Sequence, residues 1–280
     1  WLRVEKRNYY QFKNRYCIMG GFNGYKVVAH RNLDELNKEL NTVMLRRKKE
    51  EVLDLPPKIY TTEFIELTRK QRILYKEIRQ GIVDNLENIL EIPNPLSCTV
   101  RLRQLTGGVF GDDNPKLERV KDMLEEITES GHKALIFSQW EQVTSVYKEA
   151  LKGYNPAYIV GAVDPEDRQK EVDRFQNDPT CKVAIGTIGA MGTGLTMTAA
   201  SYVFFVDKRY WDAENKQAED RAHRIGTKNT VNVVSLVATN TVDEGIEEML
   251  RDNKALFDRV VEGKGSRVDV GEILRKILQY

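Results

Sequence analysis

Apolar residues recur at helical spacing at the start of the chain. Val4 to Arg15 and Leu33 to Leu45 both fit amphipathic helices, and Asn32 stands where it can cap the second one. The glycines between Gly20 and Gly24 mark the loop that joins them. The first part of the chain therefore predicts a helical segment.

The spacing changes at Ile59, where residues up to Leu67 alternate as in a strand. A long, charged helical pattern runs from Thr68 to Glu91 and resumes from Leu96 to Leu105, which predicts a pair of helices. Helices and strands then alternate: a helix from Pro115 to Glu129, strands at Ala134, Ala157, Val183, Val203 and Val231, and helices at Glu141, Glu166, Glu214 and Val242. This alternation predicts an α/β fold with a mostly parallel sheet and helices on both faces.

One segment of this alternating part combines glycines and arginines. Lys182 to Thr196 is a short apolar run followed by a Gly-rich turn, and Tyr202 to Asp207 is a second buried strand pattern. If Gln217 to Gly226 is helical, then Gln217, Arg221 and Arg224 share one face, beside an apolar stripe of Ala218, Ala222 and Ile225. Such a face suits a γ-phosphate. The alternative is a solvated helix face whose arginines pair with Glu219 and Asp220.

Composition narrows the class of protein. The 280 residues are 41% hydrophobic, enough for a substantial core in one large or two modest domains. Three widely spaced cysteines indicate neither a disulfide framework nor a zinc site, so we expect a reducing, intracellular location. No apolar run approaches the roughly 20 residues that span a membrane. The net charge is +1, so contacts with nucleic acid would depend on local patches.

The segment from Lys182 to Gly226 closely resembles the last two motifs of the Swi/Snf-type ATP-dependent DNA translocases, a branch of the superfamily-two helicases. That family's pattern ends in a Gln, two Arg and an Ile-Gly at this spacing. Lys133 to Trp140 and Asp164 to Phe175 resemble the first strand of the family's second motor lobe and the helix that follows its second strand, and Met44 to Lys58 resembles the hinge between lobes. The resemblance covers most of the chain.

The resemblance implies a RecA-like second motor lobe that acts on ATP and Mg²⁺. Arg221 and Arg224 would then be arginine fingers, with Gln217, Gly192, Gly194 and Asp220 also at the nucleotide. Some positions depart from the family pattern. Thr227 stands where a Gln is common, Met191 and Thr196 replace a Gly and an Asn, and Asp212-Ala213 replaces an Asn-Pro. Both arginines and both glycines are retained, so we expect a divergent but active member.

The resemblance also implies an organisation in four parts. Residues 1–58 would be the helical tail of the first motor lobe and the hinge, 59–110 a strand and helical protrusion, 111–262 the second lobe, and 263–280 a C-terminal segment. The body of the first lobe would be missing, and with it the usual ATP-holding motifs. No stretch has the spacing of a P-loop, including Gly263 to Ser266. The acidic pairs Asp34-Glu35 and Asp243-Glu244 stand at predicted helix starts, where carboxylates complement the helix dipole.

We therefore expect half of a catalytic site. The absent lobe of the same protein would hold most of the ATP and its Mg²⁺, and this chain alone would be inactive. No metal site of its own is expected. The family resemblance further implies a monomer that moves along double-stranded DNA, with no membrane partner.

Residues at strand ends are the candidates for gripping DNA. Ser138, Gln139 and Trp140 close the first strand of the lobe, Thr187 closes the third, and Arg168 stands on the helix after the second. Ligands of open α/β sheets bind at the carboxyl ends of the strands, and hydroxyl, amide and backbone N–H groups there hold phosphates without reading sequence. The alternatives are ordinary loop polarity for Ser138 and Gln139, and an ion pair with Asp164 or Glu171 for Arg168.

Two other classes of function remain open. The first is a non-enzymatic module that binds nucleic acid or protein and retains the fold; in that case, loss of Arg221 and Arg224 would leave turnover unchanged. The second is a dinucleotide enzyme, suggested by Gly192-x-Gly194 after a strand. The third glycine of that fingerprint is Met197 here and the loop leads to another strand pattern, so this class is disfavoured.

Overall fold

The computed structural model describes residues 7–20, 26–45, 53–80, 95–192 and 194–262. The chain forms two compact units, one made of residues 1–53 and 245–280 and the other of residues 54–244, which we call the sheet unit. Several predicted features lie outside the described residues: most of the Gly20 to Gly24 loop, much of the hinge, the end of the Thr68 to Glu91 helix and the segment 263–280. The four-part division of the chain stays a prediction.

Two short helices and a hairpin make up the N-terminal part of the first unit. Helix α1 (Tyr9–Tyr16) begins at Asn8, whose side chain and that of Gln11 form a capping box. An antiparallel pair, β1 (Cys17–Gly20) and β2 (Lys26–His30), follows, and these strands were not predicted. Helix α2 (Leu33–Asn41) confirms the second predicted helix.

The predicted cap of α2 is wrong. Asn32 has a left-handed backbone (φ 55°) and its side chain makes no capping bond. It donates instead to the carbonyl of Arg15, 3.0 Å away, and so ties the start of α2 to the end of α1. At its other end the chain forms the long helix α11 (Val242–Glu262), which confirms the helix predicted at Val242.

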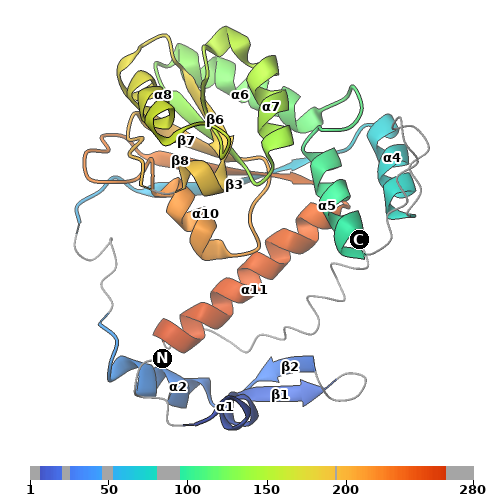
Figure 1. Ribbon diagram of the computed structural model, residues 1–280, viewed down its shortest axis with the longest axis vertical. Helices are drawn as coiled ribbons and strands as arrows, with labels where there is room; N and C mark the ends of the chain where they lie inside the picture. Colours follow the sequence, from blue (N-terminus) through green and yellow to red (C-terminus); the bar gives the residue numbers. More distant parts are fainter. Residues whose placement is uncertain (1–6, 21–25, 46–52, 81–94, 193, 263–280) are drawn as a thin grey trace. The chain divides into compact units, whose positions relative to one another are not determined.

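The core of the sheet unit is a parallel sheet of six strands (Figure 1). Its spatial order is β3 (Lys58–Ile65), β8 (Val231–Ala238), β7 (Ala200–Phe205), β4 (Lys133–Ser138), β6 (Val183–Thr187) and β5 (Ala157–Ile159). Every pairing within it is parallel, so all six carboxyl ends meet at one edge, which we call the carboxyl edge. The predicted strands and the predicted parallel sheet are confirmed.

Side chains of β4 alternate between two apolar layers. Leu135 and Phe137 pack with residues of α8 (Pro165–Asn177), α9 (Ile188–Met191) and α10 (Asp212–Glu219). Ala134 and Ile136 pack with residues of α6 (Pro115–Glu129) and α7 (Glu141–Ala150) on the opposite face. Each fully buried large aliphatic or aromatic side chain contributes about 1.5–3 kcal/mol, so these two layers dominate the stability of the sheet unit.

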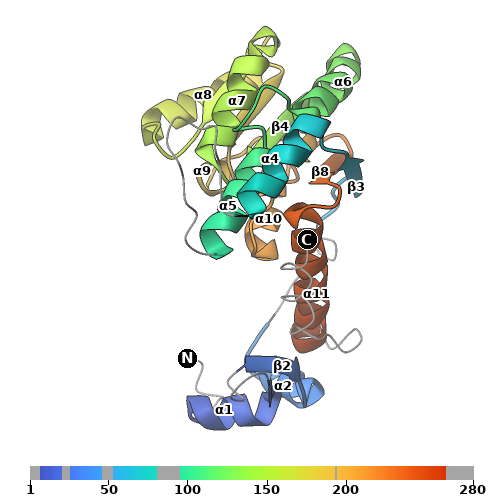
Figure 2. The same cartoon turned by 90° about the vertical axis from the view of Figure 1, so that its right-hand side faces the viewer.

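The predicted helical pair is also confirmed. Helices α4 (Arg69–Arg79) and α5 (Pro95–Thr106) lie side by side (Figure 2). Tyr75 and Ile78 of α4 pack there with Leu102 and Leu105 of α5. Strand β3, which precedes this pair in the sequence, is paired along its whole length with β8, so it is the edge strand of the same sheet.

Candidate functional site

The helix predicted through Gly226 ends seven residues early. Helix α10 stops at Glu219, and Arg221 and Arg224 lie in the turns that follow, residues 220–227, which we call the arginine turn. The predicted single stripe of Gln217, Arg221 and Arg224 on a helix face is therefore wrong. Gln217 is exposed on α10, and of the predicted apolar stripe Ile225 is 76% exposed.

Contacts with the start of β3 hold the C-terminal end of α10. The ammonium of Lys58 donates to Glu219 at 2.9 Å and to Asp220 at 2.7 Å, and the Tyr60 hydroxyl donates to Glu219 at 2.8 Å. Burial opposes the charge on Lys58, but the two carboxylates outweigh it and raise its pKa. The acidic residues that sequence alone offered as partners for the arginines thus bind a lysine from the neighbouring strand.

Arg221 is built into the interior, with 8% of its surface exposed. Its guanidinium donates to the carbonyls of Gly192 and Leu195, both at 3.1 Å, so it holds the glycine loop (residues 192 and 194–196). Burial and, next, the nearby Arg224 lower the pKa of Arg221, which nevertheless stays a cation because guanidinium is a very strong base.

The backbone of this loop requires glycine at both positions. A Cβ on Gly192 would lie 2.2 Å from the carbonyl oxygen of Ile188, and Gly194 has a φ of +74°. The loop follows α9 and leads to β7, whereas the dinucleotide fingerprint places its glycines between a strand and the start of a helix. This geometry gives the dinucleotide alternative no support.

Arg224 lies exposed on the same turn. One of its guanidinium nitrogens donates to the Thr196 hydroxyl at 3.0 Å. The Thr227 hydroxyl fixes the backbone beneath it, accepting from the Arg224 N–H at 3.0 Å and donating to the carbonyl of Ala222 at 2.7 Å. A ring nitrogen of His223 lies 2.6 Å from the Pro56 carbonyl oxygen, so this side chain anchors the turn as well.

The candidate DNA-gripping residues do gather at the carboxyl edge. Ser138 and Thr187 are register partners at the ends of β4 and β6. Thr187 caps α9, its hydroxyl accepting from the Ala190 N–H at 3.4 Å. Ser138 is only 1% exposed, and its hydroxyl donates to the Asp207 carboxylate. Ser138 therefore reaches the edge with its side chain already engaged.

Arg168 holds the neighbouring loop at the same edge. Its guanidinium donates to the carbonyls of Val163 and Gly161, both at 2.7 Å, in the loop that follows β5. Both alternative acidic partners are engaged elsewhere, since Asp164 accepts from the Glu166 N–H at 3.0 Å and Glu171 pairs with Arg174 at 2.7 Å. Arg168 thus shapes the loop through the backbone.

A buried ionic network that sequence did not predict underlies the edge. Arg103 of α5, 1% exposed, lies 3.6 Å from the Asp207 carboxylate and donates to the side chain of Gln139 at 3.2 Å and to the carbonyl of Lys208. Its guanidinium also lies 5.9 Å from the centroid of the Trp140 ring and 4.9 Å from that of Tyr210.

Asp207 is the acceptor that organises this network. The Gln139 N–H donates to its carboxylate at 2.8 Å. Burial raises the pKa of the Asp207 carboxyl, and Arg103, Ser138 and Gln139 oppose that rise. One signal pointed here: a carboxylate directly after a buried apolar run needs a buried partner. The sequence did not say which residue supplies it.

Within the described ranges, no group of three or more His, Cys, Asp or Glu side chains is arranged to hold a metal ion. In that same part of the chain, no helix has the length and apolar character required to cross a bilayer. The donors at the arginine turn are guanidinium groups, which suit phosphate oxygens rather than a metal cation.

Comparison with known proteins gives the family. Residues 115–226 match the model of the helicase conserved C-terminal domain. The human DNA annealing helicase and endonuclease ZRANB3 is 33% identical over 253 residues, which is 86% of this chain and 22% of that protein. The putative ATP-dependent helicase/translocase YwqA of Bacillus subtilis is 29% identical over 256 residues, 84% of this chain and 27% of that protein. The chain thus spans about a quarter of the length of these relatives.

A solved structure shares the fold. The Sulfolobus solfataricus SWI2/SNF2 ATPase core in complex with dsDNA superposes with a TM-score of 0.58 and 24% identity, covering 91% of this chain and 56% of that one. The matched domain, the relatives and the parallel sheet all agree with the family that the motifs from Lys182 to Gly226 resemble. This chain belongs to the Swi/Snf-type helicase family, as its second, C-terminal RecA-like lobe.

Proposed function

We propose that this lobe completes the ATP site of a double-stranded DNA translocase by supplying Arg221 and Arg224 to the γ-phosphate. The observation that carries the proposal is the arginine turn itself, where an exposed Arg224 stands on a backbone fixed by Thr227 and His223. Arg221 orders the glycine loop beside it. An arginine held in place before the nucleotide arrives needs little reorganisation when charge develops on a phosphate.

The residues present fit the phosphate end of ATP. Guanidinium groups bind phosphate oxygens in a forked geometry, and arginine fingers contribute about 10³–10⁵-fold in rate, or about 4–7 kcal/mol of transition-state stabilisation. ATP with Mg²⁺, held mainly by a first motor lobe of the same protein, supplies the phosphoryl group whose hydrolysis drives movement. Gly192 and Gly194 shape the loop beside the arginines, Gln217 precedes the arginine turn on α10, and Asp220 is the first residue of that turn.

We infer that the carboxyl edge grips the phosphate backbone of the duplex. Gln139, Trp140 and Thr187 are the direct contacts, since none of the three is fully buried. Ser138 and Arg168 act through the backbone that they hold. Support comes from the arrangement of these residues on neighbouring parallel strands and from the DNA named for the human relative and the archaeal core.

The test is ATP turnover by the full protein with and without double-stranded DNA. We expect turnover that duplex DNA stimulates, and loss of that turnover in Arg224→Ala. These 280 residues alone are expected to hydrolyse no ATP. Unchanged turnover in both Arg221→Ala and Arg224→Ala would favour the alternative, a non-enzymatic module that binds nucleic acid or protein. Absence of any DNA stimulation would remove the translocase proposal.

A further inference from the structure

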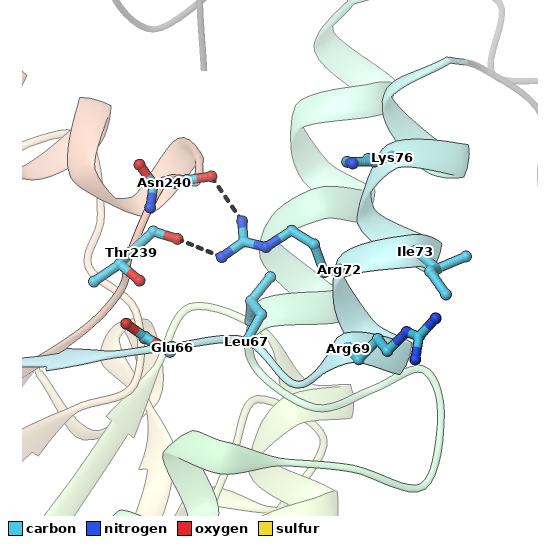
Figure 3. Close-up of a pocket in the computed structure, with 8 residues that line it drawn as sticks. All are labelled: Glu66, Leu67, Arg69, Arg72, Ile73, Lys76, Thr239 and Asn240. Carbon is cyan, nitrogen blue, oxygen red and sulfur yellow. Dashed lines mark hydrogen bonds between the residues drawn. The ribbon is translucent and has the colours of Figure 1, made fainter.

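The carboxyl edge continues beyond the proposed grip to a groove at the ends of β3 and β8. Glu66 follows β3, and Thr239 and Asn240 follow β8, with α4 beside them (Figure 3). The space between these residues and α4 is an open cavity of about 520 Å³. We call it the α4 groove. None of its residues belongs to the sites described above.

The helix that forms one wall is strongly basic. The eleven residues of α4, Arg69 to Arg79, hold five basic side chains and one acidic one. Gln71, Tyr75 and Ile78 are buried on its inner side, which leaves Arg69, Arg72 and Lys76 to line the groove. Arg72 and Lys76 are four positions apart and so share one side of the helix, which sets two positive charges along the groove.

Arg72 is oriented by two carbonyls of the opposite wall. Its guanidinium donates to the carbonyl oxygens of Thr239 and Asn240, each at 3.0 Å. A guanidinium carries five N–H donors, so three remain for a ligand. Figure 3 shows Arg72 and Lys76 on the side of α4 that faces the Thr239–Asn240 loop, with Arg69 pointing away from that loop.

Lys76 is the groove cation whose ammonium is available to a ligand. It is exposed, and within the described ranges neither a hydrogen bond nor an ion pair is found for it. Glu66 is the acidic residue among those that line the groove, and even without Arg69 the two cations Arg72 and Lys76 outnumber it, so the lining is positive overall. A positive concave surface with free N–H donors binds an anion, and it is too open to bury an apolar ligand.

We propose that the α4 groove binds the phosphodiester backbone of the same duplex, as a second phosphate contact through Lys76 and Arg72. This inference rests on the proposed function. The carboxyl ends of β8 and β4 are two strand spacings apart, about 10 Å. That separation corresponds to about three base-pair steps along the axis of a duplex, at about 3.4 Å each. A short duplex gripped at Gln139 is therefore long enough to extend to the groove, whereas an acidic peptide would have no such continuity.

The test is the salt dependence of DNA affinity in the full protein. The probe is a short fluorescent DNA duplex, and the slope of the logarithm of affinity against that of KCl concentration is measured for the parent protein, Lys76→Gln and Lys76→Glu. Loss of one phosphate contact lowers the magnitude of that slope by about 0.9 in Lys76→Gln. The weakening should be the same for unrelated DNA sequences, and Lys76→Glu should weaken binding further.

Lys152→Gln is the matched control. Lys152 is also an exposed lysine, with 68% of its side chain accessible and a solvent-exposed ion pair with Glu149, and it lies just before β5, the strand at the other end of the sheet from β3. Its replacement should leave the slope unchanged. Thermal unfolding of both glutamine variants should match the parent because neither side chain is buried.

The kinetic readout separates this proposal from the one on which it rests. Lys76→Gln should raise the DNA concentration that half-stimulates ATP turnover and leave turnover at saturating DNA intact. Arg224→Ala should leave that DNA concentration unchanged and lower turnover at saturating DNA. An unchanged slope in both Lys76 variants would overturn the groove contact even if Arg224→Ala behaves as proposed. Binding of a polyglutamate peptide that depends on Lys76, with unaltered DNA affinity, would overturn it in favour of an acidic protein ligand.

Discussion

The two arginines of the arginine turn should separate stability from catalysis when each is replaced by alanine. Arg221 is 8% exposed and makes two charged hydrogen bonds to the glycine loop, whereas Arg224 is exposed and makes one, to the Thr196 hydroxyl. Both are proposed to reach the same phosphate. We expect Arg224→Ala to impair turnover alone, and Arg221→Ala to impair both turnover and folding.

The magnitudes follow from these contacts. A hydrogen bond to a charged group contributes about 1.5–3 kcal/mol, and the Leu195 carbonyl is only partly shielded from water, so Arg221→Ala should cost about 2–4 kcal/mol of unfolding free energy. Arg224→Ala removes one solvated hydrogen bond and should cost less than about 1 kcal/mol. Each replacement should lower DNA-stimulated turnover by about 10³-fold or more.

Urea unfolding and DNA-stimulated ATP turnover of the full protein measure the two effects separately. Arg224→Lys is the control, because it keeps the charge but loses the fork that matches a phosphate, and it should restore only a small part of the rate. The reasoning fails if Arg224→Ala retains turnover within tenfold of the parent. It fails equally if Arg221→Ala is no less stable than Arg224→Ala.

Three further predictions concern the framework. Lys116→Met should destabilise the protein to urea by about 3–5 kcal/mol, since Lys116 is 1% exposed and its ammonium lies 2.7 Å from the Asp243 carboxylate, which would stay buried and unpaired; adding Asp243→Asn should recover part of the loss. Gly192→Ala should lower the thermal midpoint, because its Cβ would lie 2.2 Å from a carbonyl oxygen; Gly153→Ala, where a Cβ meets nothing within 4 Å, should not. Lys58→Met should lower stability at neutral pH. The pKa of Lys58 in the folded protein is raised above the ordinary lysine value of 10.5. Its stabilising effect is therefore complete below pH 10.5 and is lost as the pH rises through the pKa of the folded state, which urea unfolding at a series of pH values tests.

Sequence predicted the sheet well because buried parallel strands are continuous apolar runs. Val183 and Val203 begin or lie in such runs, and Val231 begins one that only Asn232 and Ser235 interrupt; each run is a strand in the structure. The hairpin was missed because β1 and β2 are only four and five residues long and alternate poorly between polar and apolar positions. Local pattern carries little information over so short a span.

Helix α10 shows a different limit. Its apolar period continues past Glu219 into Ala222, so the pattern predicts a longer helix than the chain forms. The groups that contact the end of α10 and the arginine turn, Lys58 and the glycine-loop carbonyls, are distant in sequence. The sequence likewise predicted only part of the arrangement at the carboxyl edge. Candidate residues stand at the carboxyl edge as their strand-end positions predict, whereas Arg103 of α5, the buried cation beside Asp207, was not predicted.

Two short helices connect the proposed DNA grip to the proposed nucleotide site. Thr187 caps the start of α9, and the carbonyl of Gly192 at its end accepts from Arg221, so only the four residues of α9 separate a grip residue from an arginine contact. Helix α10 begins near the carboxyl edge, where Asn215 bonds the backbone of Arg209, and ends at Lys58 on the first residue of β3. At about 1.5 Å per residue its eight residues span about 12 Å. Packed helices this short transmit a displacement with little bending, so a shift of the backbone at the carboxyl edge would move the arginine turn directly.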